Sequence, residues 1–266
     1  MDVSVFKTRF PEKLIEGTPY RIVDLNGYRY LMMVGDDDSM HSAMPLSAPD
    51  VLVVPYTMVM LSVLPLVPNL KDIVLIGLGG GQQAKFIYRR LPETRLVAVE
   101  IDPDMVRIAR SHFNVPADDD RLSVVVGDGC DYIKNHPRSC DVLLVDGYDQ
   151  TFNVPNSLVG EEFYRACYRA LRPGGVMALN LDRRSDAWRS AHLRMVSSIF
   201  SAHMELPVSD CQSVLLLSRD PLDMDYGVLM HRANALEESL ELGLPAFIKR
   251  FEKARYEATL LENSNR

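Results

Sequence analysis

A glycine-rich segment and an acidic residue follow two apolar runs at the spacing of a nucleoside-binding site. The run Ile73–Gly77 leads into Gly79, Gly80 and Gly81, and glycine both permits positive φ and lets a ligand approach the backbone closely. Taken alone, this loop is also explained as a tight turn that needs glycine. The next apolar run, Val97–Glu100, ends in a carboxylate 23 positions after Gly77, near the ~20-residue offset at which an acid binds ribose hydroxyls.

Two more acids continue this pattern at the ends of later apolar runs. Asp128 follows Leu122–Val126, and its carboxylate can accept from the exocyclic amine of adenine beside the backbone of Gly129. Asp146 ends the run Val142–Asp146. A pyrophosphate would be repelled by these carboxylates, whereas a positively charged sulfonium would be attracted to them. We therefore predict that Gly77 to Asp146 binds S-adenosylmethionine or a close relative rather than a dinucleotide.

These residues are expected to be positioned by strands that alternate with helices. Strands are predicted at residues 73–77, 96–100, 122–126, 142–146 and 176–181, and helices at 83–91, 103–113, 130–135 and 161–171, with Pro173-Gly174-Gly175 ending the last helix. Such alternation predicts a parallel sheet covered by helices on both faces. The predicted fold class is therefore α/β, with a Rossmann-like, doubly wound and mostly parallel sheet.

Smaller elements are expected on either side of this unit. Asn26-Gly27 lies between two β-prone runs and predicts a hairpin, because both residues tolerate positive φ. Residues 1–49 are predicted to form a small N-terminal β appendage, residues 50–225 the nucleoside-binding catalytic domain, and residues 226–266 a helical tail divided near Gly243. A helix at 185–201 and an antiparallel strand pair at 204–207 and 214–218 are expected at one edge of the sheet.

The composition indicates which kinds of binding partner can be expected for this protein. The chain has 266 residues, of which 47% are hydrophobic, and a formal charge of −7, which argues against binding to nucleic acid. Its four cysteines form no CxxC pair and no ligand-like spacing with histidine, so neither a metal site nor a disulfide is expected. No apolar secretory segment stands near the start, and prolines interrupt the longest apolar stretch, 51–67. We expect a cytoplasmic protein without a membrane partner.

Several short motifs of this chain occur together in one enzyme family. They are Gly79–Gln83, Glu100–Asp102, Gly127–Gly129, Asp146–Gln150, Glu162–Tyr164 and Leu171–Val176, with Tyr56 ahead of them. From about Tyr56 to Asn180 the chain resembles the polyamine aminopropyltransferases, the spermidine synthases. Their motifs at the first four segments read GGGDG in the glycine loop, EVD at the ribose, DDG at the adenine and D-S/T-S/T-D-P in the catalytic loop.

The resemblance implies transfer of an aminopropyl group from decarboxylated S-adenosylmethionine to an amine or polyamine, without a metal. Asp146 would take or relay the proton of the amine, and Asp149 would help to place it. Tyr56, Tyr148 and Asp149 would bind this acceptor. The donor would be held by Gly77, Gly79, Gly81, Gln82, Glu100, Ile101, Asp128, Gly129 and Asp146. The resemblance also implies the fold of class I S-adenosylmethionine-dependent methyltransferases and a homodimer.

The chain departs from the family pattern mainly on the substrate side. Gln82 stands for the acid that holds the donor's amine end in the family, Gln150 replaces the proline of the catalytic loop, and Gly147-Tyr148 replaces two hydroxyl residues. With glutamine instead of the acid at position 82, the pocket would have room for a donor that keeps its own carboxylate. Two other functions therefore stay open, a methyltransferase that uses S-adenosylmethionine and a catalytically silent protein that retains the nucleoside site.

Overall fold

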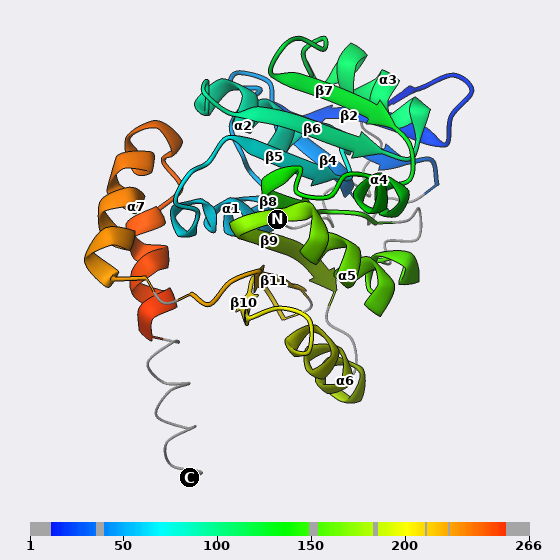
Figure 1. Cartoon of the computed structure of the whole chain (residues 1–266). Coiled ribbons are helices and arrows are strands. Elements are labelled where there is room, and N and C mark those ends of the chain that lie inside the picture. The colour runs from blue at the N-terminus through cyan, green and yellow to red at the C-terminus, as the bar shows by residue number, and fades with distance from the viewer. Residues whose placement is uncertain are drawn as a thin grey trace.

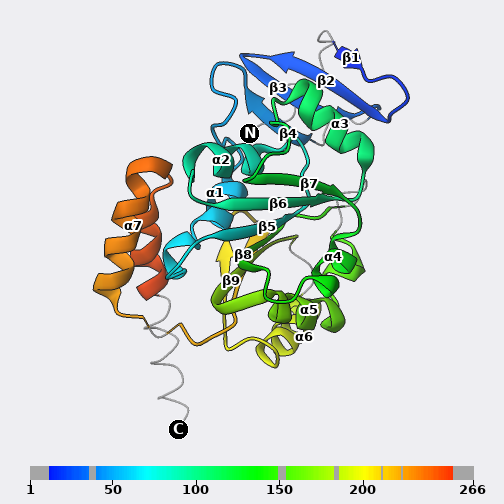
Figure 2. The same cartoon turned by 45° about the horizontal axis from the view of Figure 1, so that its top comes forward.

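The protein folds as two sheets that share the helix α3 (Pro103–His112) between them. The computed structural model describes residues 12–35, 40–148, 154–182, 186–210, 212–222 and 224–253. Figure 1 shows the larger sheet at the centre of the molecule, and Figure 2 shows the smaller N-terminal sheet, in blue, lying over α3. None of the helices in these ranges is long and apolar enough to cross a membrane.

The central sheet of the described residues is mostly parallel and doubly wound. Its strands are β5 (Asp72–Ile76), β6 (Arg95–Glu100), β7 (Leu122–Val126), β8 (Cys140–Val145), β9 (Leu171–Asp182), β10 (Ala202–Pro207) and β11 (Gln212–Ser218). They are ordered β10-β11-β9-β8-β5-β6-β7, and only the pairs that involve β11 are antiparallel. The predicted fold class and the predicted edge hairpin are therefore confirmed. Chain order reverses between β5 and β8, the place where such sheets bind ligands.

Alternation along the strands explains why helices cover both faces of this sheet. Ile73 and Leu75 of β5 point into one apolar cluster, which contains side chains of α1 (Pro55–Leu61), α2 (Gln82–Arg90) and α7 (Tyr226–Leu240). Val74 and Ile76 point into the other cluster, with side chains of α4 (Gly129–Asn135), α5 (Glu161–Ala170) and α6 (Asp186–Ser197). Successive side chains of a strand face opposite sides, so an uninterrupted apolar run needs a helix layer on each.

The N-terminal sheet is antiparallel and larger than the predicted hairpin. Its strands are β1 (Glu12–Leu14), β2 (Tyr20–Leu25), β3 (Tyr28–Met33) and β4 (Met40–Pro45), in that order. The β2–β3 hairpin is confirmed, with φ of 51° at Asn26 and 81° at Gly27. The outer strands were not predicted, because β1 has only three residues and Met40–Pro45 has few β-branched residues. Tertiary pairing, rather than local propensity, makes them strands.

One predicted boundary was wrong. The turn Pro173-Gly174-Gly175 was expected to separate a helix from a strand at Val176, but β9 already begins at Leu171. The β8–β9 ladder is irregular here, since Cys140 pairs with Leu171 and Val142 with Val176. Gly174 has φ of 77°, so the glycines form an irregular stretch within the strand instead of a loop before it. The tail is helical on both sides of Gly243, as predicted.

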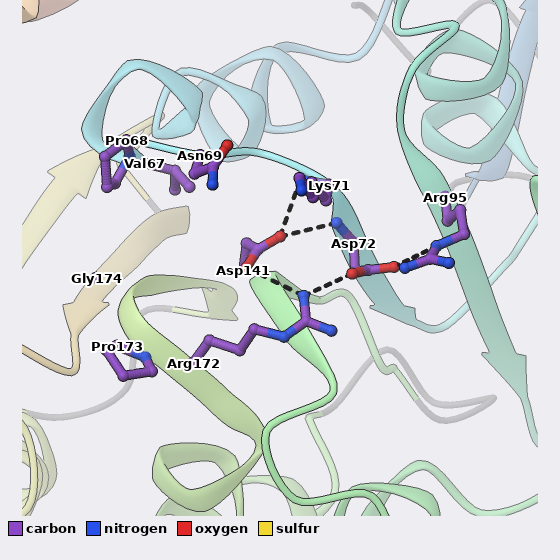
Figure 3. A pocket seen from close by; sticks show the side chains of 10 residues that line it. All are labelled: Val67, Pro68, Asn69, Lys71, Asp72, Arg95, Asp141, Arg172, Pro173 and Gly174. Atoms are coloured by element: carbon purple, nitrogen blue, oxygen red, sulfur yellow. Dashed lines mark hydrogen bonds and ion pairs between the residues drawn. The ribbon is translucent and has the colours of Figure 1, made fainter.

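Charged side chains tie together the amino ends of the central strands (Figure 3). The carboxylate of Asp141 accepts from the backbone N–H groups of Lys71 and Asp72, each at 2.9 Å, and from Arg172 at 3.2 Å. Arg172 also bonds Asp72, which accepts from Arg95 at 2.7 Å. These residues line a pocket of about 430 Å³. Their hydrogen-bonding capacity is used to join β5, β6, β8 and β9, so we read this cluster as structural.

We predict that Asp141→Ala destabilises the protein by about 2–3 kcal/mol, because two backbone N–H groups and Arg172 lose a buried acceptor. The free energy of unfolding in urea measures this. Glu161→Ala is the control, since Glu161 pairs with Arg165 on the surface and should cost less than about 1 kcal/mol. Equal losses in the two variants would contradict the structural role of the cluster.

Candidate active site

A pocket of about 750 Å³ lies at the carboxyl ends of the parallel strands, on the opposite edge from the charged cluster. Most of the residues predicted for the site line it, namely Tyr56, Gly77, Gly79, Gln82, Glu100, Ile101, Asp128, Gly129, Asp146 and Tyr148. Gly81 is not among them; it caps α2, and a Cβ atom there would lie 2.1 Å from the side chain of Val115. Asp149 lies outside the described residues. The structure thus brings together ten of the predicted positions.

Gly77 and Gly80 are required by close contacts around the pocket. A Cβ atom at Gly77 would lie 2.2 Å from the backbone oxygen of Asp146, and its φ is 88°. A Cβ atom at Gly80 would lie 2.3 Å from Oγ of Ser42 on β4. The first contact brings the ends of β5 and β8 together, and the second seats the N-terminal sheet against the loop. Side chains at these two positions would push both neighbours away.

Glu100 is buried at the end of β6, with 8% of its surface exposed. Its Oε2 accepts from the backbone N–H groups of Leu78 at 2.8 Å and Gly79 at 3.4 Å. Its Oε1 accepts from the N–H of Asp102 at 3.0 Å. The glycine loop therefore fixes the direction of this carboxylate, while a carboxylate retains further lone pairs for ligand hydroxyls.

Asp128 and Ile101 form a second part of the pocket wall. Asp128 caps α4, and its Oδ1 accepts from the N–H groups of Cys130 at 2.7 Å and Asp131 at 3.2 Å. Ile101 exposes 67% of its surface and lines the pocket. A Cβ atom at Gly129 would lie 2.4 Å from Ile76, so only glycine allows α4 to begin this close to β5. An apolar side chain next to a carboxylate and a helix start suits a flat heteroaromatic ring.

Asp146 directly follows β8 and receives three hydrogen bonds from neutral donors. Tyr56 donates from its hydroxyl to Oδ2 at 2.9 Å, Gln83 donates to Oδ2 at 3.1 Å, and Asn180 donates to Oδ1 at 2.8 Å. Gln212 of β11 donates to the side-chain oxygen of Asn180 at 2.9 Å. Because that oxygen is occupied, Asn180 must present its NH₂ group to Asp146. Four elements thereby hold one carboxylate in place.

The charge of this pocket is negative. Its lining contains four carboxylates, Glu100, Asp102, Asp128 and Asp146, and none of the described lining residues is lysine or arginine. Burial raises the pKa of Asp146, hydrogen bonds from Asn180, Tyr56 and Gln83 lower it, and the nearby Glu100 raises it, with a net rise. Burial and Asp146 raise the pKa of Tyr56 well above its ordinary value, so Tyr56 stays a hydrogen-bond donor. The arrangement attracts cations.

No group of three or more His, Cys, Asp or Glu side chains with metal-binding geometry occurs among the described residues. The three described cysteines, Cys130, Cys140 and Cys167, are free and buried. The pocket lining supplies carboxylates, tyrosine hydroxyls and neutral amides, which can bind a cation and accept a proton.

The chain matches known proteins in both sequence and fold. A family profile for the spermine/spermidine synthase domain matches residues 55–189. The chain is 33% identical to a polyamine aminopropyltransferase of Chromobacterium violaceum over 81% of this chain and 83% of that protein. The chain belongs to the spermine/spermidine synthase family. This places it among the transferases.

Solved structures agree with this membership at the level of the fold. A probable spermidine synthase from Corynebacterium glutamicum superposes with a TM-score of 0.68 at 18% identity, covering 85% of this chain and 87% of that one. Human Methyltransferase-like protein 13, solved in complex with SAH, gives a TM-score of 0.64 at 25% identity, covering 71% and 93%. The fold is therefore that of the class I S-adenosylmethionine-dependent methyltransferases, as expected.

Within this family member, the two glutamines at the start of α2 differ in their surroundings. Gln82, which was predicted to bind the donor, lines the pocket, and its amide nitrogen donates to the backbone oxygen of Ala43 on β4. Gln83 is the one that contacts Asp146. Gln83, Asn180 and Gln212 were not predicted as site residues. Neutral amides carry no sequence signal of their own, although Asn180 lies near the end of the predicted strand 176–181, at the same edge of the sheet as Asp146.

We predict that Tyr56→Phe raises the pKa of the Asp146 carboxyl, because one hydrogen bond to its ionised form is lost while its burial remains. The adjacent Thr57→Val is the control, since the Thr57 hydroxyl donates to the backbone oxygen of Val54 at 2.6 Å instead. NMR titration of the labelled Asp146 side-chain carboxyl carbon measures both. An unchanged or lower pKa in Tyr56→Phe would show that this hydrogen bond does not stabilise the carboxylate.

Proposed function

We propose that this protein transfers an aminopropyl group from decarboxylated S-adenosylmethionine to an amine acceptor. The observation that carries this proposal is the acidic pocket, in which Asp146 is surrounded by neutral donors and no lysine or arginine lines the described wall. Such a pocket suits a donor and an acceptor that are both positively charged. Membership of the family supports the same reaction.

The donor in this proposal lies along the carboxyl ends of β5, β6 and β7. Glu100 binds the ribose hydroxyls with the lone pairs that the glycine loop leaves available. Asp128 accepts from the exocyclic amine of adenine, and Ile101 packs against the ring. Gly77 and Gly79 let the sulfonium side of the ligand approach the backbone next to Asp146. These roles follow from hydrogen-bonding capacity and position around one pocket.

The acceptor amine in this proposal approaches next to Asp146. An alkylammonium must lose a proton before its nitrogen can attack, and the raised pKa of Asp146 makes that carboxylate a better base. The nitrogen then bonds to the carbon attached to the sulfonium, the C–S bond breaks, and its electron pair leaves with sulfur as neutral methylthioadenosine. Tyr56 orients the carboxylate, and Tyr148 shapes the acceptor side, with Asp149 proposed to help place the amine.

The same pocket separates decarboxylated from intact S-adenosylmethionine. The intact ligand carries a carboxylate that would enter a pocket lined by four carboxylates, without a described lysine or arginine to pair with it. We predict at least about tenfold tighter binding of the decarboxylated donor, together with formation of methylthioadenosine when an amine is added. Calorimetry and mass spectrometry measure the two results. Tighter binding of intact S-adenosylmethionine, with S-adenosylhomocysteine as product, would overturn the proposal.

A methyltransferase is the second candidate function. It is favoured by the fold shared with human Methyltransferase-like protein 13, whose structure contains SAH. The donor comparison above separates this function from aminopropyl transfer, because the two reactions leave different thioether products. Nucleoside binding without either product would instead favour a catalytically silent member of the family.

We predict that Asp146→Asn lowers kcat by about 10²- to 10⁴-fold, because the neutral amide cannot accept the proton of the acceptor amine. Donor affinity should change less, since Glu100 and Asp128 remain. Asp118→Asn serves as the control, because Asp118 pairs with Arg110 on the surface. A kcat within twofold of the control, with both variants folded, would exclude Asp146 as the base.

We further propose a cytoplasmic homodimer with the domain limits 1–49, 50–225 and 226–266. Its support is the family resemblance and the division of the described strands between two sheets.

A further inference from the structure

Tyr20 reaches from the N-terminal sheet to the wall of the donor pocket. It belongs to β2, exposes only 3% of its surface and lines the pocket. Its ring packs edge-on against that of His41, with centroids 5.7 Å apart, and contributes to the apolar cluster formed with α3. Its hydroxyl donates to Oδ2 of Asp102 at 3.1 Å. A buried tyrosine hydroxyl needs such a partner, and this partner lies two residues after Glu100.

Asp102 connects this hydroxyl to the carboxylate of Glu100. Its Oδ1 accepts from the N–H of Asp104 at 2.9 Å and so caps α3, while Oδ2 is the atom that Tyr20 reaches. The backbone N–H of Asp102 donates to Oε1 of Glu100 at 3.0 Å. A continuous series of hydrogen bonds therefore runs from Tyr20 through Asp102 and Glu100 to the glycine loop.

The surroundings keep Tyr20 protonated. Burial raises its pKa, and the carboxylates of Asp102 and Glu100 raise it further. Its hydroxyl therefore stays protonated near neutral pH and donates to Asp102. The N–H of Asp104 engages one oxygen of Asp102, and the hydroxyl of Tyr20 engages the other. A β-sheet side chain packed on α3 is a rigid support for that position.

We propose that Tyr20 is a positioning residue for the donor's ribose, acting through Asp102 on the carboxylate of Glu100. The proposal rests on the nucleoside donor of the proposed function. It gives the N-terminal sheet a direct part in substrate binding, because the hydroxyl that orients the ribose site comes from that sheet. Its effect is expected on ribose recognition and not on the chemistry at Asp146.

The test compares Tyr20→Phe with Tyr30→Phe. Tyr30 lies on the neighbouring strand β3, is similarly buried at 5% exposure and is not one of the pocket-lining residues. For Tyr20→Phe we expect the Kd of methylthioadenosine to rise about tenfold, while the Kd of its 2′,3′-dideoxy analogue stays within about twofold. Tyr30→Phe should leave both unchanged. Calorimetry measures these constants without turnover, and thermal unfolding confirms that each variant is folded.

Steady-state kinetics and a double variant sharpen this test. In Tyr20→Phe, KM for the donor should rise about tenfold, while kcat at saturating donor and KM for the acceptor are retained. In an Asp102→Asn background, Tyr20→Phe should cost much less, because the group through which it acts is already altered.

Equal losses for methylthioadenosine and its dideoxy analogue would overturn the ribose role, and so would full additivity with Asp102→Asn. Wild-type protein that binds methylthioadenosine but forms no product would contradict the proposed function while leaving the role of Tyr20 to be decided by the same titrations. Wild-type protein that binds no nucleoside would overturn both.

Discussion

The carboxylate of Asp146 is held at the carboxyl end of β8 by three neutral donors, and the rest of the site is arranged around its charge. Because Tyr56, Gln83 and Asn180 contribute hydrogen bonds but no positive charge, the negative charge stays available to a ligand. Desolvation of this carboxylate opposes ionisation and the hydrogen bonds favour it, with burial the larger effect. A buried carboxylate with a raised pKa is useful as a base and as a partner for a cation.

This arrangement depends on close approach between backbones. Gly77 allows the end of β5 to lie against the backbone oxygen of Asp146, and Gly80 allows Ser42 of the N-terminal sheet to reach the loop. The same sheet supplies Tyr20, whose hydroxyl meets Asp102. The N-terminal sheet is thus one wall of the pocket and not only an appendage, since its strands contribute hydrogen bonds as well as apolar contacts. Because this sheet packs on α3, the hydroxyl of Tyr20 lies at Asp102, whose backbone N–H bonds Glu100.

The two edges of the central sheet serve different purposes. At the amino ends, Arg95 and Arg172 form ion pairs with Asp72, and Arg172 also pairs with Asp141. These carboxylates therefore link neighbouring strands. At the carboxyl ends, no lysine or arginine is present among the described pocket residues, and the carboxylates keep their charge for a ligand. Figure 3 shows how completely the first group is paired. Acids at one edge therefore contribute to stability, and acids at the other edge are available for binding.

The sequence by itself determined the α/β class, the central parallel strands and the edge at which Glu100, Asp128 and Asp146 meet. These follow from apolar periodicity and from glycines and acids at strand ends, which are local properties of the chain. Only the tertiary structure decided that Gln83 and not Gln82 contacts Asp146, that Asn180 and Gln212 support it, and that Tyr20 reaches Asp102. Neutral polar side chains have no distinctive spacing in sequence, and their partners lie up to 82 residues away along the chain. The contacts of Gln83, Asn180 and Gln212 are fixed only when α2, β8, β9 and β11 assemble, and that of Tyr20 only when the N-terminal sheet packs on α3.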